Sequence, residues 1–168
     1  IPTNGSGEQL LKPISIDGET ITVSVVSMGN PHAVIFVDAL DDATVARIGK
    51  QLQHHPFFPQ QTNVEFVHIE DPTRVHLRFW ERGVGETLAC GTGVCAVVAV
   101  GAKLGKCERS IHALTRGGEF QAQWLASSNR ILLVGPTEIV FLGELELEAI
   151  GVPVLPTGTG GFAAASVA

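Results

Sequence analysis

The chain has 168 residues, a net charge of −6 and a hydrophobic fraction of 45%. A chain of roughly 150 residues normally forms one domain, and this apolar fraction is enough for a packed core. The acidic balance and the absence of a basic block exclude an electrostatic surface for nucleic acids. No apolar run approaches the ~20 residues of a membrane span. Three cysteines without paired spacing favour a reduced, cytoplasmic protein with no metal site.

Most of the chain alternates between short apolar runs and turn residues. Turn dipeptides such as Asp17-Gly18, Asn30-Pro31 and Asp71-Pro72 separate runs that are rich in Val, Ile and Phe. Because the connections are short, we expect most of these strands to pair in antiparallel fashion. The predicted strands cover eight segments: 19–27, 33–37, 63–69, 74–80, 110–115, 119–125, 130–135 and 138–148.

Two segments are predicted to be helices. The first runs from Asp42 to about His54, is capped by Asp41 or Asp42, and is stopped by Pro56. Its apolar residues form one stripe, as in an amphipathic surface helix: Val45, Ile48 and Leu52. The second runs from about Gly93 to Leu104 and has no polar face before Lys103, so it should be buried on all sides.

A buried helix among many strands predicts an α+β fold. We expect a mostly antiparallel sheet that is rolled into an incomplete barrel around a central helix. The predicted domain covers residues 1–150. Residues 151–168 are small, rich in Gly and Pro, and almost uncharged, which is typical of a tail or linker.

Cys90 stands directly before the buried helix in the stretch "ETLACGTGVCA". The first turn of a helix presents free N–H groups and a positive dipole end, which lower the pKa of a thiol below ~8.5 and bind carboxylates. Gly91 and Gly93 allow a ligand close to the backbone, and Thr92 is predicted to cap the helix. The alternative is a small buried cysteine at a tight turn. The flanking glycines favour a reactive thiol next to an anion pocket.

Glu81 and Arg82 end the strand that precedes this cysteine. Glu81 is in phase with the inward-facing apolar residues, and a buried carboxylate without a role is rare. Arg82 has the opposite parity, so the strand must end or bulge near Gly83 if both side chains reach one site. The alternative is an ion pair at the surface end of a strand.

Other catalytic motifs do not match. Leu88 occupies the third glycine position of a dinucleotide-binding fingerprint, and no phosphate-loop lysine follows the glycines. A cysteine hydrolase would need a histidine partner, for which His32 and His76 are candidates.

The stretch "RFWERGVGETLACGTGVCA" resembles the signature of the diaminopimelate epimerase family around the second of its two catalytic cysteines. "GNPHAVIFVD" and "QTNVEFV" resemble two further motifs of that family, and "IVFLGELEL" resembles its closing strand. The resemblance extends from about Ser27 to Glu148, in the order of the family.

This resemblance implies a cofactor-independent enzyme that inverts the α-carbon of diaminopimelate, in lysine and cell-wall biosynthesis. One cysteine thiolate removes the α-proton and a second cysteine thiol returns a proton from the opposite face. Cys90 would be one of the pair, with Glu81 and His32 beside the reacting centre. The implied substrate-binding residues are the backbone N–H groups of Gly91 and Thr92 and the side chains of Asn30, Asn63 and Arg82.

The family has two similar halves with one catalytic cysteine each, and this chain matches only the C-terminal half. Cys95 is expected in the helix core, and Cys107 lies roughly 20 Å from the helix start, so neither can face Cys90 across one carbon atom. Together with the start at Ile1, this predicts a missing N-terminal half, and a homodimer when the protein is complete. The alternatives are a related proline-type racemase and a non-catalytic half-domain that binds an amino acid.

Overall fold

The computed structural model describes residues 3–5, 7–144, 149 and 151. The chain divides into two compact units, residues 1–136 and 137–168. The predicted tail lies outside the described residues except for Gly151, so the predicted domain boundary after residue 150 stays a prediction. None of the helices in the described part of the chain is long and apolar enough to cross a membrane.

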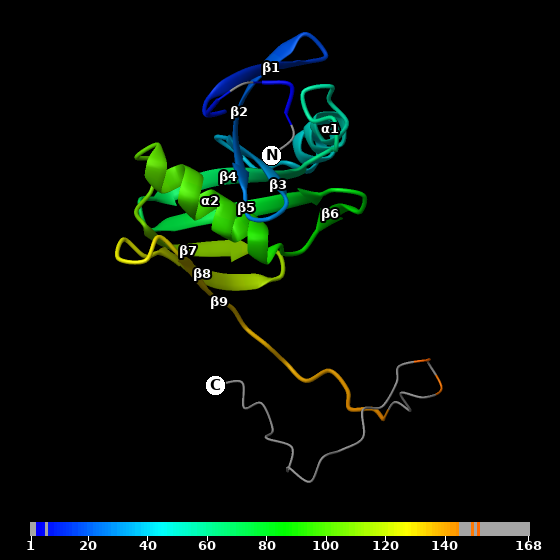
Figure 1. The fold of residues 1–168 in the computed structure, drawn as a ribbon, viewed down its shortest axis with the longest axis vertical. Coiled ribbons are helices and arrows are strands. Elements are labelled where there is room, and N and C mark those ends of the chain that lie inside the picture. The colour runs from blue at the N-terminus through cyan, green and yellow to red at the C-terminus, as the bar shows by residue number, and fades with distance from the viewer. Residues whose placement is uncertain (1–2, 6, 145–148, 150, 152–168) are drawn as a thin grey trace. The chain divides into compact units, whose positions relative to one another are not determined.

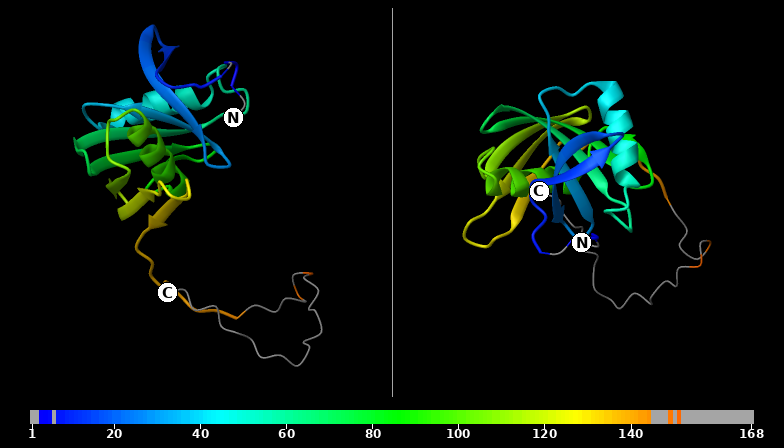
Figure 2. Two further views of the ribbon diagram at one scale, coloured as in Figure 1. Left: turned by 60° about the vertical axis from the view of Figure 1, so that its left-hand side comes forward. Right: turned by 90° about the horizontal axis from the view of Figure 1, so that it is seen from above.

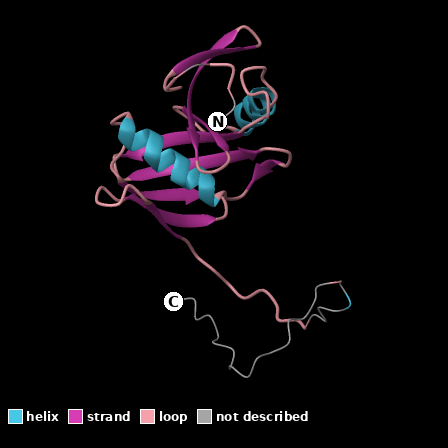
Figure 3. Cartoon of the chain, in the orientation of Figure 1, coloured by secondary structure: helices cyan, strands magenta, loops and turns pink. Residues whose placement is uncertain are grey.

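The first unit is built on one mixed sheet (Figures 1 and 3). The order of its strands is β1-β2-β3-β4-β5-β7-β8-β9, and β6 pairs only with β5. Two neighbouring pairs, β3–β4 and β5–β7, are parallel, and the other pairs are antiparallel, which confirms the mostly antiparallel α+β prediction. The strands are β1 (Lys12–Ile16), β2 (Glu19–Ser27), β3 (Pro31–Phe36), β4 (Asn63–Asp71), β5 (Arg74–Glu81), β6 (Gly85–Thr87), β7 (Ser110–Thr115), β8 (Gly118–Trp124) and β9 (Ile131–Val134).

Each parallel pair is joined by one of the two predicted helices, because a parallel connection needs a crossover. Helix α1 (Asp42–Gln53) joins β3 to β4, and helix α2 (Gly91–Lys103) follows β5 and β6 and leads to β7. The Asp41 carboxylate caps α1 by accepting a hydrogen bond of 2.8 Å from the Thr44 N–H. The predicted cap and extent of α1 are therefore confirmed.

The two helices cover different faces of the sheet (Figure 2). Strand residues alternate between the two faces, so each strand contributes to two separate apolar clusters. The cluster around α1 includes Ala33, Ile35, Val64 and Phe66. The cluster around α2 includes Val34, Val67, Val75, Leu77 and Phe79. Helix α2 packs against strands β2, β3, β4, β7, β8 and β9. The prediction that it is buried on all sides is wrong for one stripe, since Cys95 and Ala99 are only half-buried.

The sheet is open in the described part of the chain, since β1 and β9 stand at the two ends of its order. The finer prediction of an incomplete barrel around a central helix therefore stays a prediction. Two short strands, β1 and β6, were not predicted from the sequence. Strand β6 contains only Gly85–Thr87, which is too short for an alternating pattern to be read.

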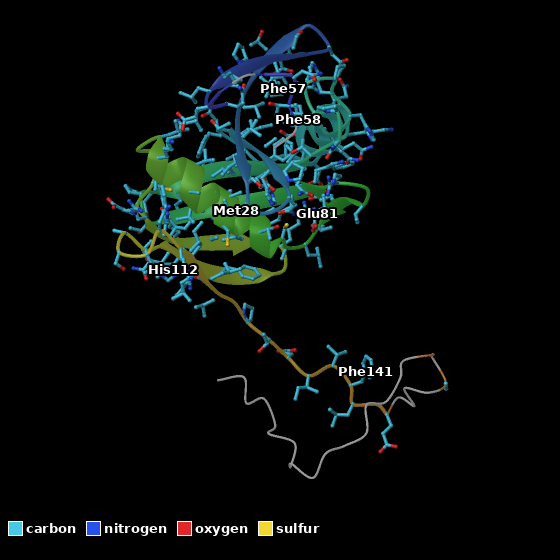
Figure 4. The ribbon with its side chains drawn as sticks, in the orientation of Figure 1. Met28, Phe57, Phe58, Glu81, His112 and Phe141 are labelled. Carbon is cyan, nitrogen blue, oxygen red and sulfur yellow. The ribbon has the colours of Figure 1, made fainter. Side chains whose placement is uncertain are left out.

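The predicted last strand, 138–148, is wrong over its described part. Residues 138–144 form no strand, and residues 145–148 lie outside the described residues. Apolar side chains of this segment are exposed, including Ile139 at 82% and Phe141 at 83% (Figure 4). An apolar run forms a strand only when a neighbour accepts its backbone hydrogen bonds, and the described residues offer this segment none.

Candidate active site

The predicted site residues on the sheet gather at one edge, on the face that carries α2. Parallel strands β3 and β4 both begin at this edge, and antiparallel β5 ends there. His32, Asn63 and Glu81 occupy these strand ends, and Asn30 precedes β3 by one residue. All four have the parity of the residues that contact α2. The strand directions therefore bring together polar residues from three separate segments.

Helix α2 begins at the same edge, and Cys90 is its N-cap residue. The prediction of a cysteine at the helix mouth is confirmed, but the predicted cap by Thr92 is wrong. Thr92 lies inside the first turn, and no side chain caps α2. Its hydroxyl instead accepts a hydrogen bond from Asn30 Nδ2 at 3.3 Å and lies 3.6 Å from Cys90 Sγ. The N–H groups of Gly91 and Thr92 precede the first intrahelical hydrogen bond, as an anion site requires.

The thiol of Cys90 is half-buried, and burial raises its pKa above the ordinary value. The nearby carboxylates of Glu81 and Glu65 raise it further. The Thr92 hydroxyl and the Gly93 N–H act in the opposite direction, but the loss of solvation dominates. This corrects the expectation of a lowered pKa. A raised pKa favours the protonated thiol, which is the form that a proton donor needs.

His32 is fully buried, and both of its ring nitrogens are engaged. Nδ1 lies 2.6 Å from Glu65 Oε1, and Nε2 lies 2.9 Å from Asn30 Oδ1. His32 is therefore linked to Cys90 through Asn30 and Thr92 rather than by direct contact. A role for His32 beside the reacting carbon stays a prediction.

Glu65 is the residue of this site that sequence reasoning missed. It is fully buried on β4, two residues after Asn63 and on the same face. The signal was present in the sequence, because "NVEFV" places a carboxylate between Val64 and Phe66 in an otherwise apolar strand. Burial raises the pKa of the Glu65 carboxyl, and the hydrogen bond with His32 opposes this shift.

Asn63 connects three segments at the edge of the sheet. Its Nδ2 donates to the Pro31 carbonyl at 2.9 Å, and its Oδ1 accepts from the Arg82 N–H at 2.9 Å. The Arg82 side chain is exposed and donates to the Gln60 carbonyl at 3.2 Å. Both amide atoms of Asn63 thus hold the backbone of the site, and substrate binding by Asn63 and Arg82 stays a prediction.

Glu81 ends β5 at the site, as Figure 4 shows. Its Oε1 accepts a hydrogen bond of 2.6 Å from the Thr87 hydroxyl across the β5–β6 hairpin. Gly83 turns the chain with φ of +79°, a conformation that suits glycine. The prediction that the strand ends near Gly83 is therefore confirmed, and the half-buried Glu81 faces the α2 side.

Gly93 lets α2 lie directly on β4 and β5. A Cβ atom on this residue would lie 2.9 Å from the Phe79 ring and 3.1 Å from Glu65 Oε1. Both distances are shorter than ordinary van der Waals contact. The glycine therefore sets how close the start of α2 comes to the buried carboxylate.

Neither Cys95 nor Cys107 is placed to act as a second thiol opposite Cys90. Cys95 was expected in the core, but it is half-buried and lines a cavity of about 580 Å³ beside α2, because the open sheet leaves this helix face uncovered. Cys107 is buried at the far end of α2, where burial raises its pKa to about 11. Thr92 lines the cavity and Cys90 does not, so the thiol stands at its margin rather than inside an enclosed pocket.

The cysteine hydrolase alternative loses one of its two candidate partners. His76 lies on the sheet face opposite α2, where its Nε2 is 2.7 Å from Glu70 Oε2. His32 is held by Glu65 and Asn30. Among the described residues, no group of three or more His, Cys, Asp or Glu side chains could hold a metal ion.

The family model described as diaminopimelate epimerase matches residues 24–140 of this chain. A diaminopimelate epimerase from Herminiimonas arsenicoxydans is 48% identical over 141 residues, which cover 84% of this chain and 50% of that protein. The corresponding protein of Desulfovibrio desulfuricans is 43% identical over 145 residues, with the same two shares. The chain thus spans about half the length of the curated relatives that it matches.

Solved structures show the same fold at low identity. A hydroxyproline epimerase from Agrobacterium vitis, with bound trans-4-OH-L-proline, has a TM-score of 0.54 and 18% identity, and the match covers 74% of this chain and 44% of that chain. A probable proline racemase from Agrobacterium radiobacter has a TM-score of 0.52 and 16% identity, with coverage of 74% and 45%. From its residues 24–140 and these relatives, the chain belongs to the diaminopimelate epimerase family.

Proposed function

We propose that this chain supplies one of the two acid/base thiols of a cofactor-independent epimerase acting on diaminopimelate. The observation that carries the proposal is the position of Cys90. Its sulfur stands at an uncapped helix start, next to the Glu81 carboxylate and at the edge where three strands place polar side chains. The same arrangement offers a proton carrier, an anion site and a site for an ammonium group.

Each group has a defined task in the proposed reaction. The N–H groups of Gly91 and Thr92 hold the α-carboxylate of the substrate, and Glu81 attracts its ammonium group. A thiolate on the far side takes the α-proton, and the electron pair left on carbon is stabilised toward the bound carboxylate. The Cys90 thiol then gives its proton to the opposite face, which inverts the centre and leaves Cys90 as the thiolate. The raised pKa of Cys90 supports its role as the donor in this direction.

We further propose that the second thiol comes from another half of the protein. The chain covers about half of its relatives, and the cysteines at positions 95 and 107 do not face Cys90. Cys90 itself is half-exposed at the margin of the cavity, as expected for a site that another surface completes. The contacts that α2 makes with both β2 and β9 in this chain support an incomplete barrel around it. The homodimer stays a prediction.

Exchange of the α-proton tests the proposal directly. The complete protein, with this chain joined to its N-terminal half, is incubated with diaminopimelate in D₂O, and deuterium at the α-carbon is followed by mass spectrometry or NMR. We expect exchange and interconversion of the LL and meso forms. Proline and hydroxyproline serve as matched competitors, and preferred turnover of either would support a proline-type racemase instead. Calorimetric binding of diaminopimelate without any exchange would support a non-catalytic binding module and overturn the proposal.

A further inference from the structure

The unexplained group at this site is the buried carboxyl of Glu65. We propose that Glu65 is a positioning residue, which acts through His32 and Asn30 to direct the Thr92 hydroxyl proton toward the sulfur of Cys90. Its importance for turnover rests on the function proposed above. The arrangement itself can be tested without turnover.

The first link is the contact between Glu65 and His32. Both side chains are fully buried, and Glu65 Oε1 lies 2.6 Å from His32 Nδ1. The other carboxyl oxygen, Oε2, has no hydrogen-bond partner within the described part of the chain. Burying a carboxylate with one unpaired oxygen lowers the stability of the folded protein. Stabilisation of the fold alone therefore does not explain the Glu65–His32 pair.

The second link is the proton on Nε2 of His32. Asn30 Oδ1 lies 2.9 Å from Nε2 and can only accept, so Nε2 carries a proton and donates it. In a neutral ring Nδ1 is then an acceptor, and the Glu65 carboxyl can donate to it; burial, which raises the pKa of Glu65, favours this form. In the other form the ring carries both protons and Nδ1–H donates to the Glu65 carboxylate. A neutral ring with its only proton on Nδ1 does not fit the contact with Asn30.

The third link carries this orientation to the thiol. With Asn30 Oδ1 held by His32, Nδ2 of the same amide points to Thr92 and donates to its hydroxyl oxygen at 3.3 Å. The Thr92 proton is then free to donate to Cys90 Sγ, which lies 3.6 Å away. A donor at the sulfur favours the thiolate, and Thr92 does lower the pKa of Cys90. Without Glu65, the amide of Asn30 can turn over and this donor is lost.

The direction in which the pKa of Cys90 changes when Glu65 is removed distinguishes a positioning role of Glu65 from a direct effect of its charge. The titratable groups that face Cys90 are Glu81 and Glu65, and each raises its pKa by charge. Removing Glu65 would therefore leave the pKa of Cys90 unchanged or lower it if only charge mattered. Loss of the Thr92 donor has the opposite effect and raises the pKa.

The test uses the complete protein and measures the rate of Cys90 alkylation by iodoacetamide against pH, resolved by peptide mass spectrometry. For Glu65→Leu we expect a higher midpoint, with alkylation about threefold slower below it, as expected for one lost hydrogen bond. Glu65→Gln should stay close to the parent, because its amide can still donate to His32 Nδ1. In a Thr92→Val background, Glu65→Leu should have no further effect. Val67→Ala, which removes packing from the same face of β4, is the matched control.

An unchanged or lower midpoint in Glu65→Leu, or an equal effect with and without the Thr92 hydroxyl, would overturn the inference. Should the variant not fold, ¹⁵N NMR of His32 in the unmodified protein decides, because a ring protonated on Nδ1 alone contradicts the proposed chain of hydrogen bonds. Failure of α-proton exchange would instead overturn the proposed function and leave these results standing.

Discussion

The two crossover connections of the sheet, β3-α1-β4 and β5-α2-β7, are built alike but begin their helices differently. Each helix packs a glycine against an aromatic residue of β5: Gly49 of α1 against Trp80 and Gly93 of α2 against Phe79. At the start of α1, the Asp41 carboxylate accepts from the Thr44 N–H. At the start of α2, the N-cap is Cys90 and no side chain closes the turn.

This difference shows that the packing of a helix and the chemistry of its start are separable. Helix α1 supplies its own anion, since the Asp41 carboxylate accepts from the Thr44 N–H in the first turn. Helix α2 has no side-chain cap, and Cys90 stands directly before its first turn. Two helices on one sheet therefore differ at their starts according to the N-cap residue, and the proposed function uses the open start of α2.

The largest expected effect concerns the thiol itself. Cys90→Ala in the complete protein should lower the rate of epimerisation by about 10³-fold or more, because the positioned acid that protonates the opposite face is lost. Cys95→Ala, five residues further along α2, should change mainly packing and leave epimerisation close to the parent rate. The measurement is the interconversion of the LL and meso forms of diaminopimelate. Equal losses in both variants would mean that α2 matters only as a core element.

A smaller effect is expected from the two packing glycines. Gly93→Ala and Gly49→Ala should each lower the free energy of unfolding by about 1–3 kcal/mol, since the new Cβ meets an aromatic ring. Urea denaturation measures this loss. Only Gly93→Ala should also change the alkylation rate of Cys90, because its Cβ also meets Glu65. A matching change in Gly49→Ala would break the distinction between the two crossovers.

The smallest effect is expected at the helix starts. Asp41→Ala should lower the stability of the protein, and Asp41→Asn should retain most of the capping effect. Thr92→Ala should lower the stability less than Asp41→Ala does, because Thr92 is not a cap. Hydrogen bonds from Thr44 lower the pKa of Asp41, so its contribution is present above the unfolded carboxyl pKa of about 3.9. That contribution disappears as the pH falls through the lower folded value. Urea denaturation midpoints measured from about pH 2 to about pH 6, a range that brackets the carboxyl pKa, test this dependence. A larger loss of stability in Thr92→Ala than in Asp41→Ala would contradict the assignment of Asp41 as the cap.

Local patterns predicted much of the fold. The turn Asp17-Gly18 and the alternating residues after it predicted the strand 19–27, and the structure has β2 at the same bounds. The stripe of α1 and its Asp41 cap were also readable, because they depend on neighbours along the chain. The predicted strand at 138–144 is wrong because strand formation depends on a partner that is distant in the chain. Its apolar pattern favours a strand, but a strand also needs a partner, and none is present among the described residues.

The sequence predicted most residues of the candidate site but not how their surroundings shift their pKa values. Strand parity predicted an inward-facing Glu81, and its carboxylate is among the groups that raise the pKa of Cys90. The glycines marked the start of the helix, where Cys90 is the N-cap residue. The shift in the pKa of Cys90 was predicted with the wrong sign, because a sequence displays the helix dipole but not the burial that outweighs it. Glu65 was missed because its partner, His32, is 33 residues away along the chain.

The sequence by itself determined the family, the alternation of strands and helices, and the position of a cysteine at a helix mouth, because each is encoded by residues close together in the chain. Only the tertiary structure decided which charges surround that cysteine. The parallel pairing of β3 and β4 places His32 beside Asn63 and lets it reach Glu65. Solvation and electrostatic interactions depend on distances in space, and these are fixed only when strands distant in sequence become neighbours in the sheet.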